Sequence, residues 1–223
     1  MNATDKAKSE GVIGAKMSLK SLSSVRAGDE DLRFKEIEHK FIVPPDFDVE
    51  KFAEQIKRIG FDHFSEVDVL DTYYLINDRP GMVFRHRVDR ELQHLSVKST
   101  RGDNVVRTEI NLNLGTHAGD QSSAVAAFMG MLTVAWHGQI HKRVRAWHLK
   151  DCEIVHYSAV AGARRVSCVE FEATRKDDRS GALGILADYE SRLGFDATTR
   201  SPQSLFELLL VPEIPTLIRT TLL

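Results

Sequence analysis

The sequence has few features that would place it in a specialised class of protein. It contains only two cysteines, Cys152 and Cys168, too few for a disulfide framework. No apolar run approaches the roughly 18 residues that a membrane-spanning helix needs. The first residues lack the apolar core of a secretory signal. We therefore expect a cytoplasmic protein with no membrane partner.

An excess of charge of one sign is also missing. The 223 residues include 30 Lys or Arg and 32 Asp or Glu, for a net charge of -2. Because nucleic-acid-binding domains are usually basic, we expect no nucleic-acid partner. Charged residues make up 28% of the chain and hydrophobic residues 42%, which is typical of a globular protein. The length fits one large domain or two small ones.

The chain divides into three parts by pattern. Residues 1–32 are polar and show no sustained period, so we predict a disordered N-terminal tail. Residues 33–211 contain the candidate strands and helices and form the predicted main domain. Residues 212–223 contain Pro212 and Pro215 and are predicted to form a C-terminal arm.

Eight candidate strands dominate the main domain, and most are separated by short turn sequences. Short connections favour antiparallel pairing. The strands are predicted at 34–43, 67–76, 82–88, 92–100, 105–114, from about 139 to 147, from about 153 and at 166–173. Helical spacing of apolar residues predicts helices at 49–59, 122–134, 183–193 and 201–210. We therefore predict an α+β fold built around an antiparallel sheet.

The segment 34–43 carries the first chemically distinctive pattern, Glu-x-Glu-x-Lys. In a strand, Glu36, Glu38 and Lys40 share one face. Two carboxylates repel by about 4 kcal/mol at a separation of 4 Å and an effective dielectric constant near 20. A bound cation removes this repulsion, so the pattern suggests half of a site for a hard metal ion. A strand face washed by solvent is the alternative interpretation.

Later strands repeat this separation of charged and apolar faces in a sorted way. Glu-x-Glu occurs in the first and last strands, while Arg-x-Arg and single lysines fill the middle ones. The arginine fork suits phosphate oxygens, so the rows together suit a metal–polyphosphate ligand. If the sheet closes, an eight-stranded barrel is just wide enough for one small ligand. A set of unrelated solvated faces is the alternative.

The ordered motifs resemble the CYTH family, also called the triphosphate tunnel metalloenzymes, over about residues 33–211. They are Glu36-Ile37-Glu38-His39-Lys40, Asp71-Thr72-Tyr73-Tyr74, Arg85-His86-Arg87, Leu95-Ser96-Val97-Lys98, Arg107-Thr108-Glu109, Lys142-Arg143-Val144-Arg145 and Val169-Glu170-Phe171-Glu172. The resemblance implies an eight-stranded antiparallel β tunnel with flanking helices. It also implies a triphosphate substrate and a divalent cofactor, Mg²⁺ or Mn²⁺.

The resemblance further implies a role for each matching residue. The implied metal ligands are Glu36, Glu38, Glu153, Glu170 and Glu172. The implied phosphate-binding residues are Lys40, Arg85, Arg87, Lys98, Arg107, Arg143, Arg145 and, as a residue over the tunnel mouth, Arg200. The predicted catalytic residues are Lys40 and Glu153. Two positions depart from the family pattern: Asn111 stands where Glu is frequent, and Glu153 stands near a frequent Asp.

We therefore predict a metal-dependent triphosphatase that acts on inorganic triphosphate or an organic triphosphate, as a monomer or homodimer. Glu153 or Glu36 is predicted to orient or deprotonate the attacking water. Two alternatives keep the fold. One is a class IV-type adenylate cyclase that makes cyclic AMP from ATP, and the other is a polyphosphate-binding module without turnover. Asp71 is interpreted as a hydrogen-bonding residue at a strand end rather than as a ligand.

Overall fold

Eight strands and the helices around them account for most of the described chain. The computed structural model describes residues 32–90, 92–102, 104–115 and 121–223. Leu32–Leu223 form one compact unit. The strands are β1 (Lys35–Val43), β2 (His63–Ile76), β3 (Met82–Val88), β4 (Gln93–Ser99), β5 (Val106–Gly115), β6 (Val134–His148), β7 (Cys152–Ala161) and β8 (Arg164–Ala173).

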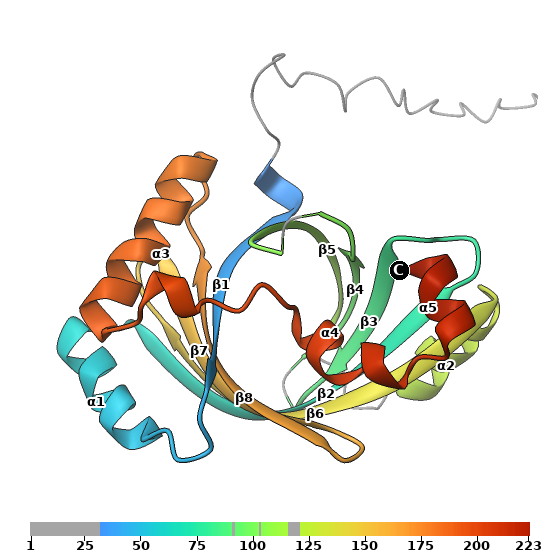
Figure 1. Ribbon diagram of the computed structural model, residues 1–223, viewed down its shortest axis with the longest axis horizontal. Helices are drawn as coiled ribbons and strands as arrows, with labels where there is room; N and C mark the ends of the chain where they lie inside the picture. The colour runs from blue at the N-terminus through green and yellow to red at the C-terminus, as the bar shows by residue number, and fades with distance from the viewer. Residues whose placement is uncertain (1–31, 91, 103, 116–120) are drawn as a thin grey trace, which may run out of the picture. The chain divides into compact units, whose positions relative to one another are not determined.

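The strands close into an antiparallel barrel in the order β1-β5-β4-β3-β2-β6-β7-β8 (Figure 1). The predicted α+β fold with an eight-stranded antiparallel barrel and flanking helices is therefore confirmed. The α-helices are α1 (Val49–Ile59), α2 (Ser122–Gly130), α3 (Arg179–Leu193), α4 (Leu205–Leu209) and α5 (Thr216–Leu222). Short 3-10 helices are η2 (Leu32–Phe34), η3 (Ala197–Thr199) and η4 (Val211–Glu213).

The main boundary error concerns the start of β6. The apolar pattern predicted a helix through Val134, but α2 ends at Gly130 and β6 begins at Val134. Thr133, with φ of 55°, turns the chain between them. The longer strand pairs with β2 along nearly its whole length. The cross-strand pairing therefore overrides the local helical pattern.

An apolar layer outside the barrel holds α1 and α3 in place. Phe52 and Ile56 lie one helical turn apart in α1 and are buried. They pack in one cluster with Leu186 of α3 and with Phe41 and Phe171 of the barrel. Because strand side chains alternate between faces, these outward aromatic residues leave the neighbouring positions of β1 and β8 free to point inward.

A second apolar cluster fills one end of the barrel interior. Leu75, Ile140 and Ala159 are inward residues of β2, β6 and β7 and are fully buried. They pack with Phe206 and Leu209 of α4. A fully buried Leu, Ile or Phe side chain contributes roughly 1.5–3 kcal/mol. The polar part of the interior is thus confined to the remainder of the barrel.

Residues 212–223 pack onto the barrel as η4 and α5. Ile214 and Leu222 are buried in the same interior cluster as α4. The backbone N–H of Gly81 donates to the carbonyl oxygen of Leu222 at 2.8 Å. The segment predicted as an arm is therefore part of the folded unit.

The chain segment 200–207 completes the wall between β1 and β5, and we call it the closing segment. The pairing of β1 with β5 spans only Lys35 to Ile37 on β1. Beyond that point the N–H of Ser201 donates to the carbonyl oxygen of Lys40 at 2.7 Å. On the other side, the amide of Asn104 donates to the Pro202 carbonyl oxygen at 2.7 Å. Figure 1 shows this segment crossing β1 on its way to α4.

Other predictions concern the tail, the cysteines and the membrane. The tail predicted at residues 1–32 lies outside the described residues except for Leu32. Cys152 and Cys168 are buried free thiols. Among the described residues, no helix combines the length and apolar character required to span a membrane.

Candidate functional site

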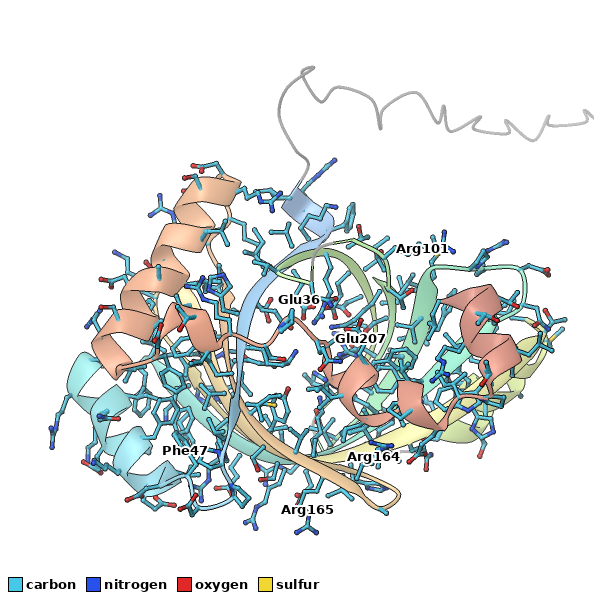
Figure 2. The ribbon with its side chains drawn as sticks, in the orientation of Figure 1. Glu36, Phe47, Arg101, Arg164, Arg165 and Glu207 are labelled. Atoms are coloured by element: carbon cyan, nitrogen blue, oxygen red, sulfur yellow. The ribbon has the colours of Figure 1, made fainter. Side chains whose placement is uncertain are left out.

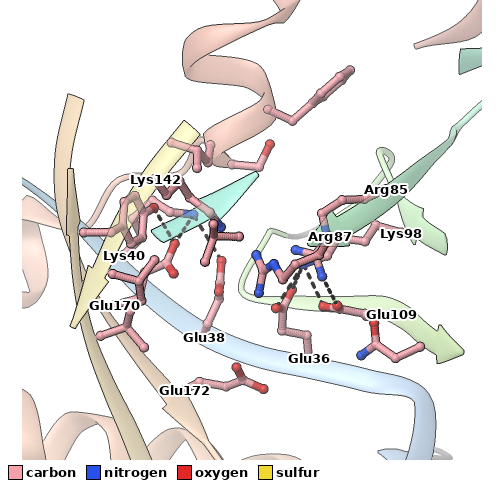
Figure 3. A pocket seen from close by; sticks show the side chains of 18 of the residues that line it. Glu36, Glu38, Lys40, Arg85, Arg87, Lys98, Glu109, Lys142, Glu170 and Glu172 are labelled. Carbon is pink, nitrogen blue, oxygen red and sulfur yellow. Dashed lines mark hydrogen bonds and ion pairs between the residues drawn. The ribbon is translucent and has the colours of Figure 1, made fainter. Parts of the chain in front are cut away.

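A cavity of about 500 Å³ lies in the barrel interior beside the second apolar cluster. Residues from all eight strands and from the closing segment line it. Glu36 lies in the barrel interior in Figure 2, whereas Arg164 and Arg165 lie at the outer end of the β7–β8 hairpin. Figure 3 shows the charged side chains of several strands converging on this space.

Strand β1 supplies two carboxylates and a lysine to the cavity. Glu36, Glu38 and Lys40 alternate with outward residues and all three are buried. The Lys40 ammonium lies 3.1 Å from Glu38 and 2.9 Å from Glu170 of β8. Because β1 pairs with β8 at Lys40 and Glu170, the backbone register itself brings this ion pair together.

Two cations on neighbouring strands hold the β1 carboxylates from the other side. Arg107 of β5 donates from Nε to Glu36 at 2.5 Å and from a terminal nitrogen to Glu38 at 2.7 Å. Lys98 of β4 lies 3.1 Å from Glu36 and 2.7 Å from Glu109. Each of these cations bridges two carboxylates, so their positions are fixed from two directions.

A third group of ion pairs joins β2, β3 and β6. Asp71 is fully buried and accepts two hydrogen bonds from Arg87, at 2.8 and 3.0 Å. The ammonium of Lys142 lies 2.7 Å from the same carboxylate. Arg85, also on β3, pairs instead with Glu109 of β5 at 2.9 Å. This pattern confirms the hydrogen-bonding role predicted for Asp71, although the residue lies within the strand and not at its end.

Burial and these partners shift several pKa values. Burial alone would raise the pKa of Glu36, but Lys98 and Arg107 hold it well below its usual value. Burial lowers the pKa of Lys142 to about 8, and Arg87 adds to the effect while Asp71 opposes it. Glu36 is therefore ionised at neutral pH, while Lys142 loses its proton just above neutrality.

A row of titratable side chains crosses five strands toward the other end of the cavity. The register places His63 opposite His148, His148 opposite Glu153, and Glu153 opposite Glu172. Glu172 in turn pairs with Glu38 of β1. Burial raises the pKa of Glu172 to about 8, and Glu36, Glu38 and Glu153 add to the effect. A cation in this region would relieve the repulsion among these carboxylates.

The donor set suits a hard divalent cation by its chemistry. The carboxylates predicted as metal ligands all line the cavity, and Mg²⁺ and Mn²⁺ prefer such oxygen donors. Within the described ranges, however, no three His, Cys, Asp or Glu side chains stand close enough to hold a metal as arranged. Lysine and arginine nitrogens take the ligand positions on Glu36, Glu38 and Glu170 instead.

Most of the predicted site residues lie together in the cavity. Its lining includes Glu36, Glu38, Lys40, Arg85, Arg87, Lys98, Arg107, Glu153, Glu170 and Glu172. Asn111, which departs from the family pattern, also lines the cavity. Its side-chain oxygen accepts a hydrogen bond from the Ser96 hydroxyl at 2.6 Å. The roles of these residues remain predictions.

Arg143 and Arg145 are the clear exceptions, because the prediction assigned them to the wrong face of β6. The Arg143 side chain is 72% exposed and pairs with Glu66, and Arg145 pairs with Glu50 of α1. The inward residues of β6 are instead Lys142, Val144 and Ala146. Both faces of this strand carry polar residues, so alternation alone could not identify the inner one.

Arg200 also lies away from the lining of the main cavity. Its guanidinium pairs with Glu190 of α3, which in turn contacts His39 of β1 at 2.5 Å. A backbone bridge joins Arg200 to Phe41. The predicted position over the mouth is therefore incorrect, and the residue helps to anchor the closing segment to β1 and α3.

The sequence interpretation missed several lining residues. Among the lining residues, Glu109, Tyr157, His94 and His148 contact predicted site residues, and Lys142 pairs with Asp71. Tyr157 donates to Glu170 at 2.7 Å. Glu109 was in the charged face of its strand but was given no role. The third group of ion pairs could have been predicted from two isolated charges. Asp71 and Lys142 each interrupt a largely apolar strand face, and opposite charges in such positions indicate a buried pair.

Sequence comparison alone finds no relative. No protein-family model matches the chain, and no curated protein is similar to it in sequence.

Comparison with solved structures identifies the fold. The protein PH1012 of Pyrococcus horikoshii superposes with a TM-score of 0.64 and 19% identity, covering 78% of this chain and 99% of that one. A candidate adenylate cyclase of Vibrio parahaemolyticus gives 0.58 and 17%, over 78% and 96%. A candidate adenylyl cyclase of Hippeastrum, HpAC1, described as having a dominant triphosphatase activity, gives 0.54 and 14%, over 82% and 98%. The chain has the CYTH, or triphosphate tunnel, fold.

Proposed function

We propose that the protein is a divalent-metal-dependent triphosphatase whose substrate binds inside the barrel. The observation that carries this proposal is the convergence of six cationic side chains on one cavity. They are Lys40, Arg85, Arg87, Lys98, Arg107 and Lys142. Arginine and lysine bind phosphate through charge-assisted hydrogen bonds, and a row of them matches a chain of several phosphoryl groups.

The carboxylates hold these cations in place before substrate arrives. Arg107 bridges Glu36 and Glu38, and Lys40 bridges Glu38 and Glu170. A triphosphate oxygen would replace a carboxylate oxygen on each cation. The released carboxylates would then require a new positive partner. We therefore expect triphosphate and metal to bind cooperatively, because either one alone leaves buried charges unpaired.

The residues that would hold Mg²⁺ or Mn²⁺ are Glu36, Glu38, Glu153, Glu170 and Glu172. When bound, such an ion supplies neutralisation of phosphate charge and lowers the pKa of a bound water. The region near Glu172 favours a site there, because its carboxylate repels Glu36 and Glu38 and Lys176, at 3.4 Å, offsets that repulsion only in part. Glu153 or Glu36 would orient the attacking water or accept its proton.

Lys40 fits a phosphate-holding role better than that of a proton acceptor. Burial alone would lower its pKa, but Glu170 and Glu38 raise it above the usual lysine value. The side chain therefore stays an ammonium at neutral pH. As a catalytic residue it would stabilise the charge that develops on phosphate oxygens during transfer.

Phosphate release from inorganic triphosphate and from ATP, each with Mg²⁺ and with Mn²⁺, tests the proposal. We expect metal-dependent turnover that is abolished in the double variant Glu170→Gln/Glu172→Gln. Glu66→Gln is the matched control, since this carboxylate lies outside the cavity and pairs with Arg143. Full activity in the double variant would refute the metal assignment.

Two alternatives use the same cavity. The likeness to candidate adenylate cyclases favours cyclisation of ATP, which chromatography for cyclic AMP would detect. The internal pairing of the cations and the neutral Asn111 favour a polyphosphate-binding module, which would bind triphosphate without turnover. A small-molecule triphosphate partner, a monomeric or homodimeric state and a cytoplasmic location stay predictions.

A further inference from the structure

One side of the cavity carries an apolar surface, bordered by Lys142 and Glu153, in contrast to the more heavily charged side already described. It consists of Val67 and Val69 of β2, Val144 and Ala146 of β6, and Val155 of β7. The register places Val67 directly opposite Val144 and Ala146 directly opposite Val155. These side chains therefore form a continuous surface across three neighbouring strands, which we call the apolar wall.

The apolar wall faces the charged strands across the cavity. In the closed order of eight strands, β6 lies four positions from β5, β2 four positions from β1, and β7 four positions from β4. The facing strands carry Glu36, Arg107 and Lys98. A bound triphosphate held by these cations would thus expose its opposite side to valine methyl groups.

The apolar wall cannot form hydrogen bonds to a fully charged ligand. Inorganic triphosphate carries charge along its whole length, and burying charged oxygens against methyl groups without hydrogen bonds is costly. An organic ring would instead bury apolar surface there, which contributes about 25 cal/mol per Å². The cavity volume of about 500 Å³ lies within the roughly 300–1,000 Å³ typical of sites for small organic ligands.

Polar groups lie at the edge of the apolar wall. His63, Ser65 and His148 line the cavity beside Val67 and Ala146. The two histidine rings stack with centroids 5.4 Å apart. Such groups can hydrogen-bond to the heteroatoms of a ring whose face lies on the valines. The edge therefore adds specificity that an alkyl group would not use.

We propose that the apolar wall binds the organic part of the substrate, so that the protein prefers a triphosphate ester with a planar heterocycle, such as a nucleoside 5′-triphosphate, over inorganic triphosphate. This inference rests on the proposed binding of a triphosphate by the charged side. The phosphate chain lies along β1, β5 and β4, and the ring lies against β2, β6 and β7.

Competing substrates test the proposal. For the wild-type protein with Mn²⁺, we expect kcat/KM for consumption of ATP to exceed that for inorganic triphosphate by about tenfold or more. Ala146→Leu fills the space beside the apolar wall. We expect it to lower kcat/KM for ATP by about tenfold and to change kcat/KM for inorganic triphosphate by less than about threefold. Val144→Thr keeps the side-chain volume, adds a hydroxyl and should reduce only the ATP value. Val97→Thr, on the outer face of β4, is the matched control.

The outcomes separate this inference from the function itself. A preference for inorganic triphosphate, or equal losses for both substrates in Ala146→Leu and Val144→Thr, overturns the apolar wall as a ring-binding site and leaves the triphosphatase proposal standing. If turnover is absent, calorimetric binding of inorganic triphosphate and of a non-hydrolysable ATP analogue replaces kcat/KM, with the same expected ratios. Binding of neither ligand overturns both proposals.

Discussion

The two halves of the barrel wall share one backbone geometry and differ in chemistry. Strands β8, β1, β5, β4 and β3 direct many charged side chains into the cavity, whereas β2, β6 and β7 contribute the valines and alanine of the apolar wall together with fewer charged groups, Lys142 and Glu153. In both halves most inward residues alternate with outward ones, apart from register shifts near Leu75 and Gln93. The backbone therefore defines where a ligand can lie, and the inward residue types determine which side of the ligand is charged.

The difference also shows why charge alone is a poor guide to the inner face. On β1 the inward face is charged and the outward face carries Ile37 and Phe41, which pack beneath α3. On β6 the most exposed arginine, Arg143, lies outside, while Val144 lies inside. Helix α1 covers the outer face of β6 at Trp147, whereas Arg143 on the same face is exposed, so polar residues can occupy part of that outer face.

The largest expected effect comes from removing the metal, which tests whether the charged half needs a cation. We expect EDTA to lower turnover by about 1,000-fold or more, since the ion that would neutralise phosphate charge is then lost. Triphosphate binding measured by calorimetry should also weaken at least tenfold, because freed carboxylates remain unpaired. Added Mg²⁺ or Mn²⁺ should restore both. Undiminished turnover in EDTA would contradict the proposal.

Replacing one arginine on each side of the barrel wall separates inner from outer charges. Arg107→Gln removes the guanidinium that donates to Glu36 and Glu38 and that is proposed to donate to phosphate. Each such charge-assisted hydrogen bond contributes roughly 1.5–3 kcal/mol. We expect kcat/KM to fall by about 100-fold or more. The matched change Arg143→Gln, at an exposed ion pair, should alter kcat/KM by less than about twofold. Comparable losses in the two variants would mean that the outer face takes part in binding.

A third experiment concerns the apolar end of the barrel, where the interior is packed rather than open. Phe206→Ala deletes a buried ring that contacts Tyr73 at a centroid distance of 5.4 Å. We expect the free energy of unfolding to fall by about 3–5 kcal/mol, measured by urea denaturation. Leu217→Ala is the control, because that side chain is 79% exposed and should change stability by less than about 0.5 kcal/mol. Equal effects would contradict the packing described.

The smallest expected effect is a pH dependence that arises from Lys142, the lysine of β6 that lines the cavity. Burial lowers the pKa of Lys142 to about 8, with Arg87 adding to the effect. The ammonium that would hold phosphate is lost as the pH rises through this value, so kcat/KM should fall up to about tenfold between pH 8 and 9. Lys142→Arg keeps the charge and should remove this decline. A decline of the same size in Lys142→Arg would exclude Lys142 as its source.

Lys142 also affects stability, which should rise with pH over a range in which kcat/KM falls. Between the folded pKa near 8 and the ordinary lysine value near 10.4, the unfolded chain binds the proton more strongly. The contribution of Lys142 to the free energy of unfolding therefore increases as the pH rises through this range. A comparison of wild type with Lys142→Met by urea denaturation at pH 8 and pH 10 measures it.

Local sequence was sufficient to predict much of the fold and most of the charged half. The Glu36–Lys40 pattern and the pairs at Arg85 and Glu170 alternate cleanly, and turns between the middle strands favour antiparallel neighbours. Alternation could not choose the inner face of β6, because the choice depends on which helix covers the sheet. Nor could it show the closing segment, whose contacts with Asn104 join residues about 100 positions apart.

The closing segment has a consequence for how the protein reaches its native state. Strand β1 is synthesised early, yet its partners Glu170 and Ser201 follow only after most of the described chain. Joining such distant segments carries a large loop-closure entropy, and domains rich in these contacts fold slowly. During this delay the edge of β1 and its ionisable side chains remain open to water, so chaperone dependence and aggregation should respond to changes in residues 200–207 more than in the hairpins.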